Sequence, residues 1–132
     1  MIVLDASAAI AVLLNLDGSS AGIRERIGRS SGGLHVPHLF DVEVLHAIRR
    51  HTLRGALSVS RSYQALEALR NMRATHYPHT ALLPRMWELR ENLAAYDAAY
   101  VALAETLDAP LITKDARLAH ASGHRATVEL YR

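Results

Sequence analysis

The first fourteen residues of the chain, MIVLDASAAIAVLL (Met1–Leu14), place one charged side chain inside an apolar segment. Twelve of the fourteen residues are apolar, and Asp5 and Ser7 are the exceptions. A segment of this composition is suited to burial, whereas a buried carboxylate costs free energy unless it is paired. The position of Asp5 therefore asks for an explanation in terms of structure or function.

This segment does not have the features of a membrane or secretory segment. No Lys or Arg precedes Arg24, so the positively charged start of a secretory signal is missing. After Leu14 the sequence NLDGSS (15–20) ends the apolar run, well short of the roughly 20 residues that a membrane span needs. We expect a cytoplasmic protein with no membrane partner, in which Met1–Leu14 belongs to the core.

The composition narrows the class of protein further. A chain of 132 residues suits a single domain, expected over residues 1–132, with a hydrophobic core of its own. It contains no cysteine, which excludes disulfides, zinc–thiolate sites and thiol nucleophiles. Fourteen of the 15 basic residues are Arg, a side chain suited to phosphate. Biased genomic base composition explains the same excess, so the Arg content alone does not decide for nucleic acid.

Short apolar strands alternate with helical segments along the chain. The predicted strands cover 2–5, 34–37, 75–79, 110–113 and 126–130. The predicted helices cover 7–14, 20–29, 40–54, 58–73, 81–91, 97–107 and 115–122. The segment 75–79 is assigned to an edge because Pro78 is tolerated only there. This alternation predicts an α/β fold with a short, mainly parallel sheet covered by helices on both faces.

Four acidic residues stand at matching places in this pattern. Asp5 and Asp115 each follow a predicted strand, and Glu43 and Asp97 each stand near a helix start. Ligands of open α/β sheets bind outside the carboxyl ends of the strands, which favours a functional site. Helix capping explains each acid equally well when it is considered alone, and it explains Ser7 in the same way.

If the four acids converge, their charges need compensation. Like charges repel, and desolvation costs about several kcal/mol per ion. A divalent cation is the usual solution, and oxygen ligands favour Mg²⁺, with Mn²⁺ as a plausible substitute. A bound metal ion turns water into a nucleophile near neutral pH, so the pattern indicates metal-assisted hydrolysis.

The helix that carries Glu43 also carries basic residues on the same face. His46 and Arg50 follow Glu43 by three and seven positions, whereas Arg49 lies well round from that stripe. Three roles are open to Arg50: contact with a phosphate group, a pair with an acid, or a solvated position on the surface. Trp87, Phe40 and the tyrosines are assigned mainly to core-like helical positions, so no base-stacking platform is expected.

At the level of whole motifs, the sequence resembles a known family. MIVLDASAAIAVLL, VPHLFDVEVLHAIRR and LAAYDAAYVALAETLDAPLITKDARL, with their spacing, resemble PIN domains, and specifically the toxin ribonucleases of VapBC toxin–antitoxin systems. The resemblance covers essentially the whole chain and implies a three-layer α/β/α sandwich with Mg²⁺-dependent endoribonuclease activity. It further implies a small VapB-like antitoxin that blocks the acidic groove, and a homodimer formed through helical faces.

The resemblance also assigns roles to individual residues. The metal-binding and catalytic acids of the family match four positions of this sequence, Asp5, Glu43, Asp97 and Asp115. Thr113, and less directly Ser7, match polar positions that support the acids. Some relatives carry another acid shortly after the last Asp, where this chain has Arg117. This departure leaves open whether one or two metal ions bind.

Two other functions are compatible with an acid at a strand end. In a phosphotransfer domain, Asp5 would be the phosphorylated residue. Haloacid-dehalogenase-type enzymes need a second acid two residues later, where this chain has Ser7, and the order of acids does not fit a response-regulator receiver. A PIN-like module that only binds a protein is the stronger alternative, although four intact acids argue against a degenerate site.

Overall fold

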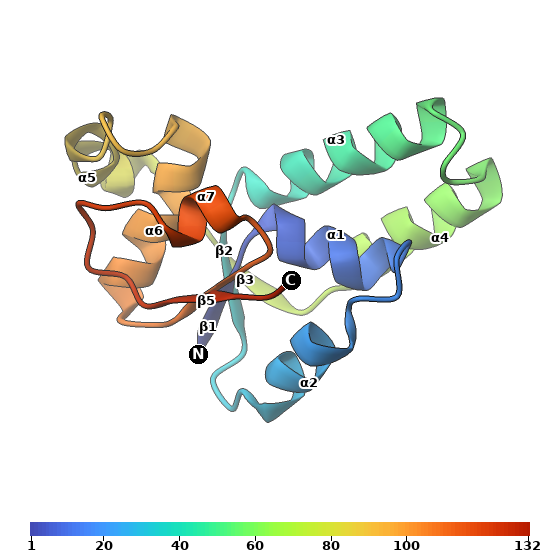
Figure 1. Ribbon diagram of the computed structural model, residues 1–132, viewed down its shortest axis with the longest axis horizontal. Helices are drawn as coiled ribbons and strands as arrows, with labels where there is room; N and C mark the ends of the chain where they lie inside the picture. The colour runs from blue at the N-terminus through green and yellow to red at the C-terminus, as the bar shows by residue number, and fades with distance from the viewer.

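Five short parallel strands form the central sheet of the computed structural model, which describes residues 1–132 (Figure 1). The strands are β1 (Ile2–Leu4), β2 (Leu34–Pro37), β3 (Ala74–Tyr77), β4 (Leu111–Thr113) and β5 (Val128–Leu130). Their order across the sheet is β3-β2-β1-β4-β5. Every pair of neighbours is parallel, so the sheet is wholly rather than mainly parallel.

This strand order creates one topological switch point. The chain runs outward from β1 to β2 and β3, and then returns to place β4 on the other side of β1. The direction of winding therefore reverses between β1 and β4. The crevice outside the carboxyl ends of two such strands is where open α/β sheets bind their ligands. Asp5 and Thr113 stand at this crevice.

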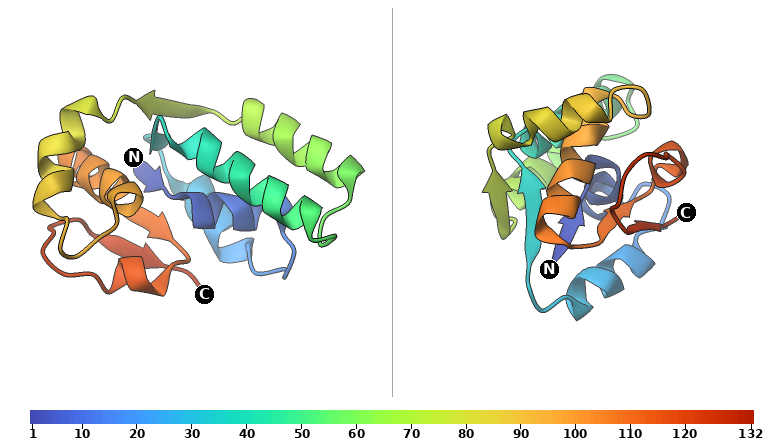
Figure 2. Two further views of the ribbon diagram at one scale, coloured as in Figure 1. Left: turned by 90° about the horizontal axis from the view of Figure 1, so that it is seen from above. Right: turned by 90° about the vertical axis from the view of Figure 1, so that its left-hand side faces the viewer.

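Helices cover both faces of the sheet and complete three layers (Figures 1 and 2). The helical segments are α1 (Ala6–Leu14), α2 (Ala21–Arg29), α3 (Phe40–Leu53), α4 (Val59–Arg70), the 3₁₀ turn η1 (Thr80–Leu82), α5 (Leu83–Glu88), α6 (Ala95–Leu107) and α7 (Ala116–Ala119). On one side α1 packs against β4, α2, α3 and α4, and on the other α6 packs against β1, β2, β4 and α5. None of these helices combines the length and the apolar character needed to cross a membrane.

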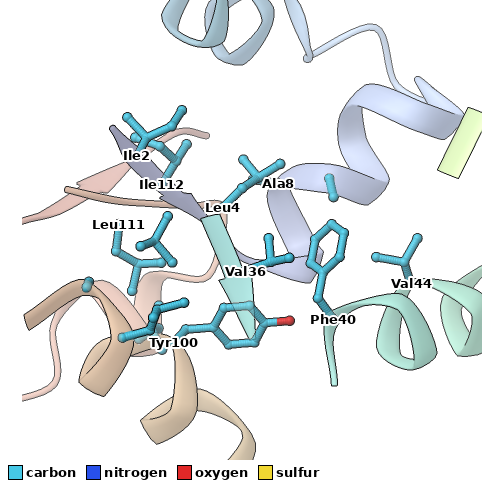
Figure 3. Close-up of a cluster of buried hydrophobic side chains, with 14 of the residues drawn as sticks. Ile2, Leu4, Ala8, Val36, Phe40, Val44, Tyr100, Leu111 and Ile112 are labelled. Atoms are coloured by element: carbon cyan, nitrogen blue, oxygen red, sulfur yellow. The ribbon is translucent and has the colours of Figure 1, made fainter. Parts of the chain in front are cut away.

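The core lies between β1 and the helices on its two sides. All three residues of β1 have no exposed surface, and Leu111 and Ile112 of β4 are buried equally. Figure 3 shows the ring of Tyr100 among these side chains, with its oxygen directed toward the start of α3. A polar atom at this depth needs a hydrogen-bond partner, which the site provides.

The predicted elements are all present, but several boundaries differ. The helix predicted over 97–107 begins two residues earlier, at Ala95. The segment 81–91 divides into η1 and α5, because Pro84 has no amide hydrogen to continue a helical ladder from the preceding turn. The helix predicted over 115–122 is reduced to the single turn of α7.

The expectation that the aromatic side chains are mostly in the core was wrong. Phe40 and Tyr100 are buried, but Tyr63, Trp87 and Tyr96 are 69%, 67% and 66% exposed. Helical periodicity identifies the residues that share a face. It does not show whether another element covers that face, and here three aromatic rings remain uncovered.

Candidate active site

The four predicted acids come together at the switch point between β1 and β4. Asp5 directly follows β1, Asp115 lies just after β4, and Glu43 and Asp97 stand in the first turns of α3 and α6. The charge of Asp97 raises the pKa values of both Asp5 and Glu43, and the charge of Asp115 raises the pKa of Asp97. The acids are therefore close enough to repel one another.

Asp5 is the most tightly held of the four. Its Oδ1 accepts hydrogen bonds from Ser7 Oγ at 2.7 Å and from the Ala8 amide at 2.9 Å. The Thr113 hydroxyl donates to Oδ2 from the end of β4. The Ala8 bond is an N-terminal cap of α1, so the capping reading is correct for Asp5. Capping and membership of the acidic cluster coexist in this one residue.

Ser7 and Thr113 occupy the supporting places predicted for them. The Ser7 hydroxyl donates to Asp5 and accepts the Lys114 amide at 3.0 Å. The Thr113 hydroxyl donates to Asp5 and accepts the Asp115 amide at 2.9 Å. Each hydroxyl thus ties the end of β1 to the segment that follows β4. Thr113 has no exposed surface, so its orientation is fixed by packing as well.

Glu43 is oriented by a residue that the sequence reasoning missed. The hydroxyl of Tyr100 donates to Glu43 Oε1 at 2.6 Å, and the Tyr100 side chain is 2% exposed. Burial, together with this bond to Glu43, raises the pKa of Tyr100 far above its ordinary value, so the hydroxyl stays a donor. A signal was present in the sequence, because Tyr100 follows Asp97 by three positions and shares its helix face.

Asp97 and Asp115 differ in how their oxygens are used. Asp115 caps α7 by accepting the Arg117 amide at 2.9 Å. Asp97 accepts no hydrogen bond from the chain, and the N-cap of its helix is Ala94. The capping alternative therefore holds for Asp5 and Asp115 and fails for Glu43 and Asp97.

Burial dominates the electrostatics of this cluster. It is the largest cause of the raised pKa values of Asp5, Glu43 and Asp97. Hydrogen bonds from Thr113, Ala8 and Ser7 lower the pKa of Asp5 but do not cancel the effect of burial. Only Asp115 forms an ion pair, at 3.7 Å from Arg117 Nη2, whose side chain is 90% exposed. The other three acids form no ion pair within the chain, and the charge of Arg117 lowers the pKa of Asp97 without cancelling the effects of burial and Asp115.

The donor set fits a hard divalent cation. Both oxygens of Asp97 and one oxygen of Glu43 accept no hydrogen bond, although both side chains are half-buried. Partly desolvated carboxylates without a counter-ion are the ligands that Mg²⁺ and similar cations select. In this structure no three of the acids stand close enough together to hold one ion, so it is the chemistry of the carboxylate oxygens that fits a cation.

Arg50 does not pair with the acids. Its guanidinium is exposed and forms neither an ion pair nor a hydrogen bond within the chain. It lines a groove of about 520 Å³ between α1 and α3, together with Ser7, Glu43, His46 and Tyr96. Arg50 therefore does not serve as the partner of an acid. It either contacts a ligand or is simply solvated.

Comparison with known proteins identifies the family. The model of the PIN domain family matches residues 2–123. VapC ribonuclease Mb0985 of Mycobacterium bovis is 48% identical over 118 residues, which cover 89% of this chain and 88% of that protein. Ribonuclease VapC1 of Mycobacterium tuberculosis is 40% identical over 131 residues, covering 98% and 97% of the two chains.

Solved structures agree with the fold. The structure of VapBC2 from Rickettsia felis, bound to a DNA fragment from its promoter, gives a TM-score of 0.72 at 13% identity and covers the whole of both chains. That of VapBC-5, a member of the VapBC toxin–antitoxin family from Mycobacterium tuberculosis, gives 0.55 at 26% identity and covers 99% and 97% of the two chains. With the acids gathered at the switch point and these relatives at 40–48% identity, the chain belongs to the PIN-domain family of VapC ribonucleases.

Proposed function

We propose that this protein is an endoribonuclease toxin that uses Mg²⁺, with Mn²⁺ as a substitute, and that acts in the cytoplasm as a single domain. The observation that carries the proposal is the cluster of Asp5, Glu43 and Asp97, whose carboxylates are partly desolvated, repel one another and form no ion pair. The names of the relatives, which are ribonucleases, support RNA as the substrate.

In this proposal each acid has a specific task. Asp5, Glu43, Asp97 and Asp115 hold the cation, which when bound activates water and neutralises charge on the phosphodiester. Ser7 and Thr113 fix the rotamer of Asp5, and Tyr100 fixes one oxygen of Glu43 and leaves the other free. No Ser or His nucleophile is needed for the hydrolysis.

The same acidic cluster suits an inhibitory partner. An Arg side chain from a small antitoxin would match a carboxylate through two hydrogen bonds and supply the missing positive charge. The similarity to VapBC-5, a member of the VapBC family of toxin–antitoxin systems, supports such a partner. A homodimer formed through α3 and α4 is supported by the exposed apolar side chains of these helices, Val42, Leu45, Leu53, Val59 and Tyr63.

Paired substitutions on α6 test the ribonuclease proposal. We expect Asp97→Asn to abolish cleavage of single-stranded RNA in the presence of Mg²⁺ while the fold is retained. Asp108→Asn is the matched control, since Asp108 is exposed at the far end of the same helix, in a left-handed conformation that Asn tolerates. Cleavage is followed by mapping the new RNA ends. Full activity of the Asp97→Asn protein would refute the assignment.

A further inference from the structure

The groove between α1 and α3 opens directly beside the acidic cluster. Ser7 and Glu43 belong to both, and the groove continues along α3 past His46 to Arg50. With a rise of about 1.5 Å per residue, the seven positions from Glu43 to Arg50 span roughly 10 Å. A chain molecule that reacts at the acids would therefore extend into this groove.

The lining of the groove changes in character along its length. Its apolar lining consists of the small and aliphatic side chains Ala6, Ile10, Val42 and Ala47. At the acidic end the ring of Tyr96 stands beside the groove, 66% exposed, in the position directly before Asp97. The aromatic side chain thus lies next to the cluster without being part of the core.

Positive charge lies at the other end of the groove. The guanidinium of Arg50 has no acid or carbonyl partner within the chain, and the imidazole of His46 likewise forms no hydrogen bond. An apolar lining with an exposed aromatic ring and a free Arg is complementary to a nucleotide, which combines the flat π-face of a base with an anionic phosphate. Proteins bind single-stranded nucleic acid by this combination of aromatic stacking and basic side chains.

We propose that this groove is a nucleotide subsite, in which one unpaired base of the RNA substrate stacks on Tyr96 and a neighbouring phosphate contacts Arg50. The proposal rests on the proposed ribonuclease function and adds to it the place that holds the nucleotide next to the reacting phosphate. Ser7 and Glu43 are hydrogen-bonded within the acidic cluster and Arg50 is assigned to a phosphate, which leaves His46 as the one other polar side chain of the groove that can contact a base edge. Recognition is therefore mainly by stacking, with modest preferences among the four bases.

Two substitutions of Tyr96 distinguish the effect of its aromatic ring from the effect of a large apolar side chain. In an Asp97→Asn background, which prevents cleavage, Tyr96→Phe keeps the ring and Tyr96→Leu removes it. Base stacking of about 1–3 kcal/mol corresponds to a loss of affinity of about 5- to 140-fold for the Leu variant. The Phe variant should stay within about twofold of Tyr96. The probes are fluorescent single-stranded RNA octamers, and melting curves establish that each variant is folded.

RNA that lacks one base tests whether Tyr96 contacts a base or only supports the structure. Removing the base at one position of the octamer should weaken binding to the chain with Tyr96 intact. The same removal should cost nothing in the Leu variant, because the two changes delete the same contact. Equal affinities of the Leu and Phe variants would overturn the inference.

The inference and the proposed function fail in different ways. If the active chain cleaves RNA but no abasic position depends on Tyr96, only the nucleotide subsite is wrong. If Asp97→Asn still cleaves RNA, the assignment of the acids is wrong whatever happens in the groove. If the Asp97→Asn chain with Tyr96 intact binds no octamer, the subsite is refuted as well.

Discussion

Asp5 answers the question that the first fourteen residues raise. Its carboxylate caps α1 through the Ala8 amide, and the hydroxyls of Ser7 and Thr113 hold it at the end of β1. The bond from the Ala8 amide is sufficient to cap α1. The two further donors, the hydroxyls of Ser7 and Thr113, therefore serve to orient the carboxylate. Such precise support is typical of a ligand-binding group, because the partners of a metal ligand fix its geometry and tune its basicity.

Tyr100 holds Glu43 in the same way. Removing the hydroxyl of Tyr100 alone tests this role. Tyr100→Phe deletes the hydroxyl that donates to Glu43 Oε1 at 2.6 Å and leaves the packing of the ring intact. Loss of a group that supports a metal ligand typically costs about 10- to 100-fold in metal affinity or activity. We expect the Mn²⁺ concentration for half-maximal RNA cleavage to rise by a similar factor.

The pH profile distinguishes this role from a general effect on folding. The Tyr100 bond lowers the pKa of Glu43, so its loss should move the acid limb of the cleavage profile to higher pH. Tyr77→Phe is the control, since its hydroxyl hydrogen-bonds to His35, away from the acids. An unchanged Mn²⁺ requirement and pH profile in Tyr100→Phe would show that the bond has no part in positioning Glu43.

At the scale of elements, α3 joins the acidic cluster to the groove. Glu43, His46 and Arg50 line the groove together, while Arg49 lies on the side facing α4. The position of the helix therefore gives two neighbouring Arg residues different surroundings. Since the two residues carry the same side chain and the same charge, they form a natural pair for comparison.

We expect Arg50→Ala to weaken RNA binding and to reduce its salt dependence, whereas Arg49→Ala should change neither. Each lost phosphate contact lowers the slope of log affinity against log salt concentration by about 1. A salt titration of RNA affinity for the wild type and both variants measures this slope. Equal slopes for all three proteins would show that Arg50 makes no phosphate contact and is simply solvated.

The elements also show how far the sequence predicts this structure. Strand ends and helix starts are local features, so the meeting of Asp5, Glu43, Asp97 and Asp115 follows from the order of strands and helices. Exposure depends instead on what packs against a face. The pattern therefore gave no sign that Tyr96 would be uncovered. It places Tyr100 on the helix face of Asp97, but helical spacing does not identify Glu43 as the partner of the Tyr100 hydroxyl across the core.

For the whole molecule, the acidic cluster makes stability depend on pH. Burial and neighbouring charges raise the pKa values of Asp5, Glu43 and Asp97 in the folded state. At pH values between the ordinary pKa of about 4 and these raised pKa values, the folded chain holds protons that the unfolded chain has released. The free energy of unfolding therefore falls as the pH rises through this window, and the loss persists at neutral pH.

Asp97→Asn should consequently make the metal-free protein more stable at neutral pH, because it removes one of the repelling charges. The gain should disappear in acid, where the cluster of the wild type is protonated. Melting curves from pH 3 to 8 in the presence of a chelator measure the difference between the two proteins. Asp108→Asn, which lies outside the cluster, should melt like the wild type throughout.

Adding a divalent cation should reverse this order of stabilities. A cation that binds only the folded state stabilises it by about 2.7 kcal/mol at a hundredfold excess over its Kd. Wild type and Asp108→Asn should therefore melt at higher temperature in millimolar Mn²⁺ at neutral pH. Asp97→Asn, with one ligand fewer, should gain much less. The effect should vanish in acid, because protonated carboxylates do not bind the cation. Equal gains for wild type and Asp97→Asn would place the cation elsewhere on the molecule.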